Sequence, residues 1–239
     1  MFPFETVKSE KKILTDCLGK VEFWIKGKKS LGSGSLVKTL NTLNTPVIAT
    51  AAHCLFDWEY KEFYEKVNFY PYVGNFKTSL SPVISVIPKI WADVGAVEYD
   101  TGFLVLSESI DLIEYNKYAI PVKFNLSNEL SYSIAGFQNK IIPSRKPIIS
   151  KGKAQKDLFK NSTLQGINSK GKSGMSGGPW ISYQNSEYFQ NSVSSMSFKS
   201  LKNMLWGPYW GDTIKSAYEV AIGSKQTDPR VLIHEYKYQ

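Results

Sequence analysis

The feature that most constrains this fold is a series of short runs rich in Val, Ile, Tyr and Phe, each bounded by Gly, Pro, Asn or Ser. Such runs are typical of short β-strands. Helical spacing of apolar residues occurs in two places, 58–65 and 212–222. Strands this dense with so few helices predict an all-β sandwich or a pair of β-barrels. The predicted strands cover residues 20–27, 34–39, 46–53, 66–73, 81–88, 98–106, 132–138, 179–184 and 191–198.

The length of 239 residues fits one large all-β domain or two small barrels that share a cleft. A break near Pro121 divides the chain into halves of similar length. We therefore expect residues 1–122 to form an N-terminal barrel, and residues 123–239 to form a C-terminal barrel with a helix and a tail. No stretch approaches the roughly 18 apolar residues of a membrane span, so no membrane contact is expected.

The chain is basic, with a net charge of +8 and a pI near 9.2. A charge of this size is compatible with binding to nucleic acid or to another anionic partner. However, the lysines are scattered, and no stripe of Lys and Arg interleaved with aromatic residues falls on one predicted helix. Solvated surface lysines are therefore favoured, and a basic nucleic-acid-binding protein stays as an alternative.

Three separated segments carry the residue types of nucleophilic catalysis. Serine is a weak nucleophile at neutral pH, so it needs a base within hydrogen-bond reach, and the base needs a partner that fixes its tautomer. His53, Asp100 and Ser176 supply these three groups, with Ser176 as nucleophile and His53 as general base. Their segments are TAAHC (50–54), YDTGFLVL (99–106) and GMSGGP (174–179).

Asp93 is an alternative to Asp100 as the partner of the histidine, because ADVGAVEY also leads into an apolar stretch. We prefer Asp100, since DTGFLVL continues into a longer buried run. Loss of activity in Asp93→Ala but not in Asp100→Ala would reverse this assignment.

The glycines beside Ser176 permit a tight turn in the backbone. Such a turn can direct the N–H groups of Gly174 and Ser176 at one point, where they would stabilise the oxyanion of an acyl-transfer reaction. The loss of one such donor costs roughly 3–4 kcal/mol of transition-state stabilisation.

On these three motifs the chain resembles the chymotrypsin/trypsin-like serine endopeptidases, especially the compact, disulfide-poor bacterial members. TAAHC is similar to their histidine loop, DTGFLVL to their aspartate strand and GMSGGP to their serine loop. The resemblance implies two six-stranded antiparallel β-barrels, a C-terminal helix and hydrolysis of peptide bonds in a protein or peptide substrate. It implies no cofactor, and no His, Cys and Asp cluster has the spacing of a metal site.

The resemblance also implies a pocket that selects the substrate side chain. Counting back six residues from Ser176 to the expected pocket base gives Lys170, and Lys172 follows two residues later. Trypsin-like relatives carry aspartate at the base and cleave after basic residues, so a lysine there would favour cleavage after acidic ones. The alternative is that both lysines point to solvent. Ser194 takes the place of the family serine on the strand that lines the pocket.

Met175 stands where many relatives carry an aspartate. In those relatives the aspartate pairs with a new N-terminal ammonium after cleavage of a precursor, and Ile13 in KKILTD lies where such an N-terminus could arise. Met175 cannot accept an ammonium, and a buried unpaired charge is costly, so we do not expect this activation. The loop is then held either by apolar packing of Met175 or by an activating partner protein that orders a latent enzyme.

The cysteine content points to a reducing compartment, because a secreted domain of this kind usually carries several disulfides. Cys54 lacks the partner that many relatives carry on the preceding strand, so we expect a buried free thiol, although a bond to Cys17 stays open. With no signal-like run near the N-terminus, a cytoplasmic bacterial enzyme of regulated proteolysis is expected by analogy. A catalytically silent protease-fold binding module is the main rival.

Overall fold

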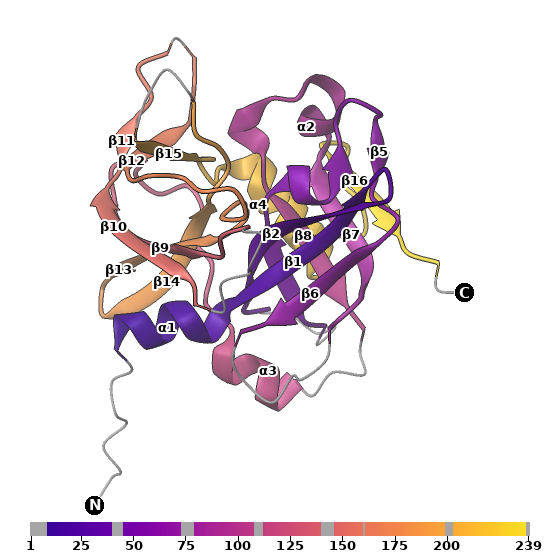
Figure 1. Ribbon diagram of the computed structural model, residues 1–239, viewed down its shortest axis with the longest axis horizontal. Coiled ribbons are helices and arrows are strands. Elements are labelled where there is room, and N and C mark those ends of the chain that lie inside the picture. The colour runs from indigo at the N-terminus through magenta and orange to yellow at the C-terminus, as the bar shows by residue number, and fades with distance from the viewer. Residues whose placement is uncertain are drawn as a thin grey trace, which may run out of the picture.

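The structure is a computed structural model that describes residues 9–39, 45–72, 79–107, 112–139, 146–159, 161–198 and 203–237. Residue 73 of one predicted strand and the first eight residues, which entered the compartment prediction, therefore lie outside the described residues. Figure 1 shows the strands in two groups that come from the two halves of the chain, except that the C-terminal strand joins the first group, with α2 near one end of the molecule and α1 and α3 near the other. The helices are α1 (Glu10–Cys17), α2 (Lys89–Val94), α3 (Leu112–Tyr118) and α4 (Asp212–Ala221), with 3-10 turns η1 (Ala52–Cys54) and η2 (Val97–Tyr99).

The first group is an antiparallel sheet with the strand order β16-β7-β8-β3-β2-β1-β6 among the described residues. An isolated bridge joins Phe69 of β6 to Leu80, two residues before β7, with N–H···O distances of 2.7 and 2.8 Å. This bridge brings the two ends of the six N-terminal strands together and curls the sheet. The strands are β1 (Leu18–Ile25), β2 (Lys28–Val37), β3 (Val47–Thr50), β6 (Val67–Pro71), β7 (Pro82–Pro88), β8 (Gly102–Leu106) and β16 (Val231–Glu235).

The second group forms two smaller antiparallel sheets, with orders β10-β9-β13-β14 and β11-β12-β15 among the described residues. The bridge between Met196, which follows β14, and Trp206 of β15 links these two smaller sheets. The strands are β9 (Ser131–Gly136), β10 (Ile148–Lys153), β11 (Gln155–Lys156), β12 (Gln165–Asn168), β13 (Pro179–Gln184), β14 (Glu187–Val193) and β15 (Met204–Gly207).

Each group has its own apolar core. In the first group β3 and β8 are buried along their whole length, because α4 covers the face of β7 and β8 that the sheet does not enclose. Aromatic rings fill this layer, with Phe103 lying 6.1 Å from Trp210 and 5.7 Å from Tyr218 between ring centroids. The second core gathers around Trp180 and Phe189 and includes Met175.

Hydrogen bonds between buried side chains join the two groups. The Ser33 hydroxyl donates to the Gly174 carbonyl at 2.7 Å and accepts from the Phe137 N–H at 2.8 Å. The Ser35 hydroxyl donates to Gln190 Oε1 at 2.7 Å. Helix α1 also contacts the second group at one end of the molecule (Figure 1), where the Glu10 carboxylate interacts with Ser133 and Lys151. These contacts fix the cleft between the two groups.

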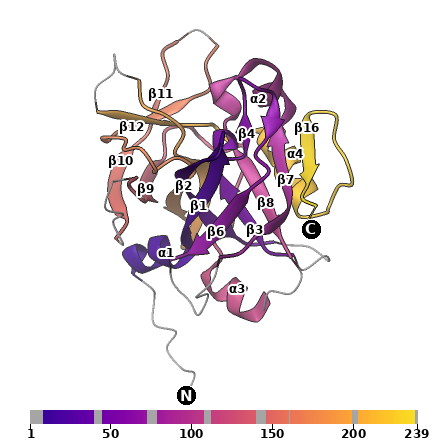
Figure 2. The same cartoon turned by 45° about the vertical axis from the view of Figure 1, so that its right-hand side comes forward.

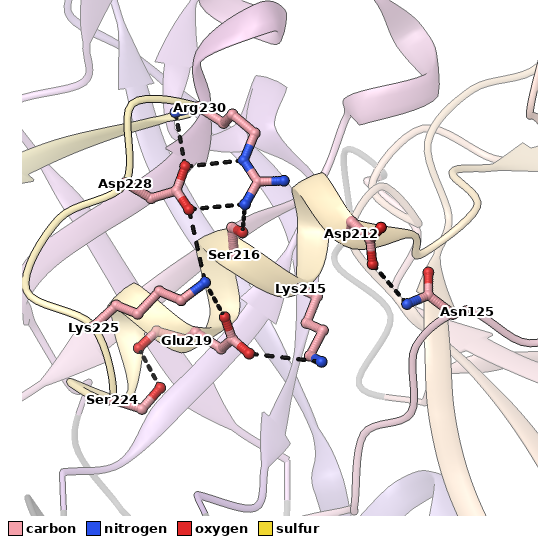
Figure 3. Close-up of polar contacts among 9 residues, drawn as sticks. All are labelled: Asn125, Asp212, Lys215, Ser216, Glu219, Ser224, Lys225, Asp228 and Arg230. Carbon is pink, nitrogen blue, oxygen red and sulfur yellow. Dashed lines mark hydrogen bonds and ion pairs between the residues drawn. The ribbon is translucent and has the colours of Figure 1, made fainter.

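The C-terminal segment returns to the first group, although it belongs to the predicted C-terminal half. β16 pairs with β7, and Figure 2 shows it beside α4 at the outer edge of the sheet. A polar network holds the turn between α4 and β16 (Figure 3): the Arg230 guanidinium donates two hydrogen bonds to the Asp228 carboxylate at 2.9 and 3.0 Å, its backbone N–H donates a third at 2.9 Å, and Lys225 pairs with Glu219. Within the described residues the tail thus extends the N-terminal sheet.

The strand-rich pattern and the helix predicted at 212–222 are confirmed, but the helix predicted at 58–65 is wrong. That segment forms a hairpin, β4 (Phe56–Asp57) and β5 (Glu62–Phe63). The Asp57 carboxylate accepts hydrogen bonds from the N–H groups of Glu59 and Tyr60, and Lys61 adopts a φ of 58° that ends any helical path. A tight turn therefore overrides the helical spacing.

Candidate active site

His53 lies in η1, directly after the buried strand β3. The Thr50 hydroxyl at the end of β3 donates to the Ser33 carbonyl at 2.7 Å, which fixes the point where the chain leaves the sheet. The side chain of His53 is 34% exposed, whereas its neighbours Ala52 and Cys54 are buried. The turn thus presents the imidazole at the cleft while the residues around it anchor the backbone.

Asp100 follows η2 and precedes β8, and its carboxylate is completely buried. Oδ1 accepts the backbone N–H of His53 at 2.9 Å, and Oδ2 lies 2.7 Å from Nδ1 of the same residue. The hydroxyl of Ser195 donates to Oδ2 as well. One carboxylate therefore fixes both the backbone and the ring of His53. Asp93 lies on the surface instead, where it pairs with Lys89 at 2.8 Å.

Burial and charge act on the pair in opposite directions. Burial is the largest single influence and lowers the pKa of the His53 imidazole, but the charge and hydrogen bond of Asp100, together with Cys54, outweigh it, so that this pKa lies well above its ordinary value of 6.5. Burial raises the pKa of the Asp100 carboxyl, but the charge and hydrogen bonds of His53, with the hydrogen bond from Ser195, lower it overall. Asp100 is therefore ionised at neutral pH.

The loop at 171–178, which we call the serine loop, packs against the segment that carries His53. The Ser33 N–H donates to the Ser176 carbonyl at 2.6 Å. Gly177 has a φ of 80°, and a Cβ atom there would lie 2.2 Å from both the Ser33 carbonyl oxygen and Thr50 Oγ1. Only glycine fits this approach. The Ser176 hydroxyl and the His53 ring, both described, do not form a hydrogen bond, which is common in the absence of substrate.

The N–H groups of Gly174 and Ser176 donate to no other group within the residues that the structure describes. Gly174 has a φ of 94°, and its carbonyl is held by the Ser33 hydroxyl. The Met175 N–H between them is occupied, because it donates to the Lys172 carbonyl at 3.0 Å. The turn therefore leaves two donors, the ones that the sequence predicts, available to an anion.

Met175 holds the serine loop from behind. Its side chain is 1% exposed and belongs to the second core, and the glycine at 136 gives it room, since a Cβ there would lie 2.9 Å from the Met175 Cα. Ile13, the residue at which a new N-terminus could arise, lies within helix α1, and its N–H donates to the Ser9 carbonyl at 3.0 Å. Within the described residues the loop is thus packed by apolar contacts.

A cavity of about 240 Å³ opens beside Ser176. Lys172 lines it with an exposed side chain, whereas Lys170 is exposed and lies outside its wall, so Lys170 does not form the pocket base that we expected. Neither an aspartate nor a glutamate is part of the described wall. The wall consists of Gly171, Lys172, Ser173, Met175, Ser176, Ser195, Met196, Ser197 and Leu205.

The prediction for Ser194 needs a correction by one residue. Ser194 is fully buried, and its hydroxyl accepts a hydrogen bond from the Trp180 indole at 3.0 Å. Ser195 instead lines the cavity and contacts Asp100. Both serines follow β14, where the Ser194 N–H donates to the Gly178 carbonyl and the Ser195 N–H to the Trp206 carbonyl, so the two adjacent residues turn to different neighbours.

Cys17 and Cys54 are both buried free thiols, so the bond between them that the sequence left open is not formed. In the part of the chain that the structure describes, no group of three or more His, Cys, Asp and Glu side chains is placed to bind a metal ion. No described helix has the length and apolar character needed to cross a membrane.

Comparison with solved structures identifies the architecture as the chymotrypsin-like double-barrel fold. The protease Anisep from Arthrobacter nicotinovorans is 28% identical with a TM-score of 0.75, over 87% of this chain and 96% of that one. The thermostable serine protease AL20 from an extremophilic microorganism is 27% identical with a TM-score of 0.77, over 89% and 100%. A Glu endopeptidase and human heparin binding protein, at 15% and 13% identity, share the fold, with TM-scores of 0.69 and 0.62. No family model and no curated protein matches the chain.

Proposed function

We propose that this chain, which resembles chymotrypsin-like serine proteases in fold, is a serine endopeptidase with Ser176 as nucleophile, His53 as general base and Asp100 as the group that orients the base. The observation that carries the proposal is the buried Asp100 carboxylate, which accepts the backbone N–H of His53 at 2.9 Å and lies 2.7 Å from its Nδ1. A buried carboxylate is costly unless its hydrogen bonds are satisfied, so an arrangement that spends them on one half-exposed imidazole favours a catalytic role.

The geometry supports a reaction in two steps. Asp100 keeps the proton on Nδ1 of His53, which leaves Nε2 free to take the proton of the Ser176 hydroxyl as that oxygen attacks the peptide carbonyl. The N–H groups of Gly174 and Ser176 stabilise the oxyanion. His53 then protonates the leaving amine, and a water molecule, activated by the same histidine, hydrolyses the acyl-enzyme.

We propose further that the enzyme needs no N-terminal processing. Met175 supports this, because its buried side chain supplies apolar contacts where a charged pair would otherwise be required. Latency that is relieved by a partner protein stays as the alternative. Full activity of the purified, unprocessed chain on a peptide substrate would favour packing, and activity only after addition of lysate would favour a partner.

The cavity beside Ser176 supports selection against basic side chains rather than trypsin-like specificity. A lysine or arginine side chain would find no counter-charge in its described wall, whereas the exposed Lys172 at its rim would repel a cation and attract a carboxylate. We therefore propose cleavage after acidic or uncharged residues. Preferred cleavage after Lys or Arg in a peptide library would contradict this.

The free thiols of Cys17 and Cys54 support, in addition, a cytoplasmic location.

A serine-directed fluorophosphonate probe tests the proposal. We expect labelling of the wild type, loss of labelling in Ser176→Ala, and unchanged labelling in Ser224→Ala, which alters an exposed serine in the turn after α4. Absence of labelling with and without lysate would instead favour the silent binding module. That rival needs consideration because a protein named for heparin binding shares the fold, so the fold alone does not decide activity.

A further inference from the structure

A second and larger cavity, of about 460 Å³, opens on the first barrel. It lies between the turn that joins β1 to β2 and the β4–β5 hairpin, and it shares no residue with the cavity beside Ser176. Four aromatic rings line it: Trp24, Tyr60, Phe63 and Tyr64. Aromatic faces are attractive to cations and to the methylene groups of long side chains.

Two of these rings already hold an ammonium group of the chain itself. Lys26 Nζ lies 4.0 Å from the centroid of the Tyr60 ring, and Lys66 Nζ lies 4.5 Å from the centroid of the Trp24 ring. The chain thus uses this surface as a cation receptor within its own fold. The aromatic wall is suited to a further cation for the same electrostatic reason.

Carboxylates outnumber ammonium groups in this wall, although the chain as a whole carries +8. Asp57, Glu62 and Glu65 line the cavity against Lys26 and Lys66. The carboxylate of Asp57 is engaged by the hairpin backbone, but within the described residues neither Glu62 nor Glu65 forms an ion pair with a lysine or arginine, although Glu65 interacts with the charge of His234. Two carboxylates therefore remain available to a cationic ligand.

Tyr64 offers a polar group to the cavity. Its side chain is 8% exposed and lines the cavity, and its hydroxyl is not one of the fully buried atoms that lack a partner, so within the described residues it is accessible from outside. Burial, followed by the nearby Asp57 and Cys54, raises the pKa of this phenol, so it stays neutral. The hydroxyl can therefore accept a hydrogen bond from an ammonium or guanidinium group in the cavity.

The cavity is directly connected to the catalytic segment. The Tyr64 N–H donates to the Leu55 carbonyl at 2.9 Å, and Leu55 follows the turn that carries His53. The wall of the cavity and the turn that carries His53 are therefore joined through the backbone.

We propose that this cavity is a second substrate subsite that binds a lysine or arginine side chain of the polypeptide, several residues away from the bond that is cleaved. This inference rests on the proposed peptidase function. The rings hold the aliphatic stem, Glu62 and Glu65 pair with the charge, and the Tyr64 hydroxyl accepts a hydrogen bond. The substrate class is thus a polypeptide with an acidic or uncharged residue at the cleaved bond and a basic residue at a distance.

The test compares matched fluorogenic peptides in which one position at a time, on either side of the cleaved bond, carries lysine or Nε-acetyl-lysine. We expect lysine at one position to raise kcat/KM by about three- to tenfold, and high salt to remove the gain. The gain should disappear in the double variant Glu62→Gln/Glu65→Gln and persist in Glu59→Gln, which removes a carboxylate from the same hairpin but outside the cavity.

A binding measurement distinguishes failure of the proposed subsite from failure of the proposed peptidase function. A peptide containing the preferred lysine, or Nα-acetyl-lysine methylamide if no peptide is cleaved, is titrated into Ser176→Ala and followed by tryptophan fluorescence. Quenching that is lost in Glu62→Gln/Glu65→Gln supports the cavity as a cation site even if catalysis fails. Efficient cleavage with no effect of lysine at any position, and equal behaviour of the Glu59 and Glu62/Glu65 variants, would overturn the subsite and leave the peptidase proposal intact.

Discussion

The His53–Asp100 pair and the serine loop are held in place by different kinds of interaction. The pair depends on charge: a fully buried carboxylate accepts hydrogen bonds from His53 and from Ser195. The serine loop depends on shape: Met175 is packed in an apolar core, and Gly177 fits against the barrel because it has no side chain.

The elements around the His53–Asp100 pair are also held largely by polar contacts. Polar contacts and one ring stack secure the elements next to the pair. The Arg230 carbonyl accepts the Lys89 N–H at 2.7 Å where α2 begins, and His234 of β16 stacks on Phe63 of β5 at 5.0 Å. We infer that changes in charge or pH act mainly on the pair, whereas changes in side-chain volume and polarity act mainly on the serine loop.

Asp100→Asn should give the largest effect. The amide can accept from the His53 backbone, but it favours the wrong tautomer of the ring and removes the charge that stabilises the imidazolium. We expect kcat/KM to fall by about 10⁴-fold, the order seen when this group is neutralised in such a triad. Asp93→Asn is the control, because Asp93 lies in a surface ion pair, and it should retain activity within about twofold. The reverse result would make Asp93 the partner of His53.

Met175→Asp tests the apolar half of the site. A carboxylate in this core would lack a partner, so we expect the free energy of unfolding to fall by about 3–5 kcal/mol. Met175→Leu keeps the volume and should cost less than about 1.5 kcal/mol. Urea unfolding in the Ser176→Ala background avoids self-digestion. Equal stability of the two variants would mean that the aspartate finds a cation, such as a processed N-terminus, and that packing is not what holds the loop.

The pH dependence of kcat/KM tests the His53–Asp100 pair, which is the charged half of the site. His53 must be neutral to act as a base, so kcat/KM should fall as the pH falls through its pKa, and the raised pKa places the midpoint above 6.5. In Asp100→Asn the midpoint should move to lower pH, since the carboxylate is the main group that raises the His53 pKa. The same shift has a stability consequence: the contribution of protonated His53 is complete below pH 6.5 and is lost as the pH rises through the folded-state pKa. A wild-type midpoint at or below 6.5 would contradict this assignment.

The sequence predicted the strand-rich fold class because strand patterns are local, whereas the partnership of His53 with Asp100, 47 residues apart, was predicted from their motifs and the double-barrel fold from the resemblance that these motifs carry. TAAHC and DTGFLVL each place a polar residue at the end of a buried strand, and that placement follows from the order of residues alone. Ser195 was missed because two adjacent serines fit the motif, and only the folded backbone shows which of them contacts Asp100. The cavity lined by Trp24, Tyr60, Phe63 and Tyr64 was missed as well, since Trp24 of β1 meets the other three rings only in the folded chain.

The hairpin at 58–65 teaches the same lesson from a wrong prediction. Helical spacing was present there, but Asp57 closes a turn, and Phe56 packs edge to face on Phe63 at 5.1 Å. The missed strand β16 is a second example, because it pairs with β7 from far along the chain. Non-local pairing of this kind leaves no local signal in a single sequence.

A clasp between this hairpin and α2 allows a finer test of the charged half. Lys61 Nζ donates to the carbonyl groups of Ala92 and Asp93 at 2.7 and 3.0 Å, at the end of α2, and lies 4.3 Å from the centroid of the Trp58 ring. The Trp58 ring in turn packs on Gly95, where a Cβ would approach it to 2.7 Å. The clasp thus ties the segment after His53 to the segment that leads to Asp100.

Lys61→Met keeps the aliphatic stem and removes the charge, so it should have the smallest effect of the series. We expect the free energy of unfolding to fall by about 1 kcal/mol. We also expect kcat to fall by about threefold with KM unchanged, because a loosened Asp100 segment weakens a contact that matters in the transition state. Lys61→Arg should restore kcat, and Lys89→Met, which removes an exposed ion pair on the same helix, should leave kcat unchanged. A loss of stability without a change in kcat, or in the midpoint of the acidic limb, would restrict Lys61 to a structural role and confine the charged half to His53, Asp100 and Ser195.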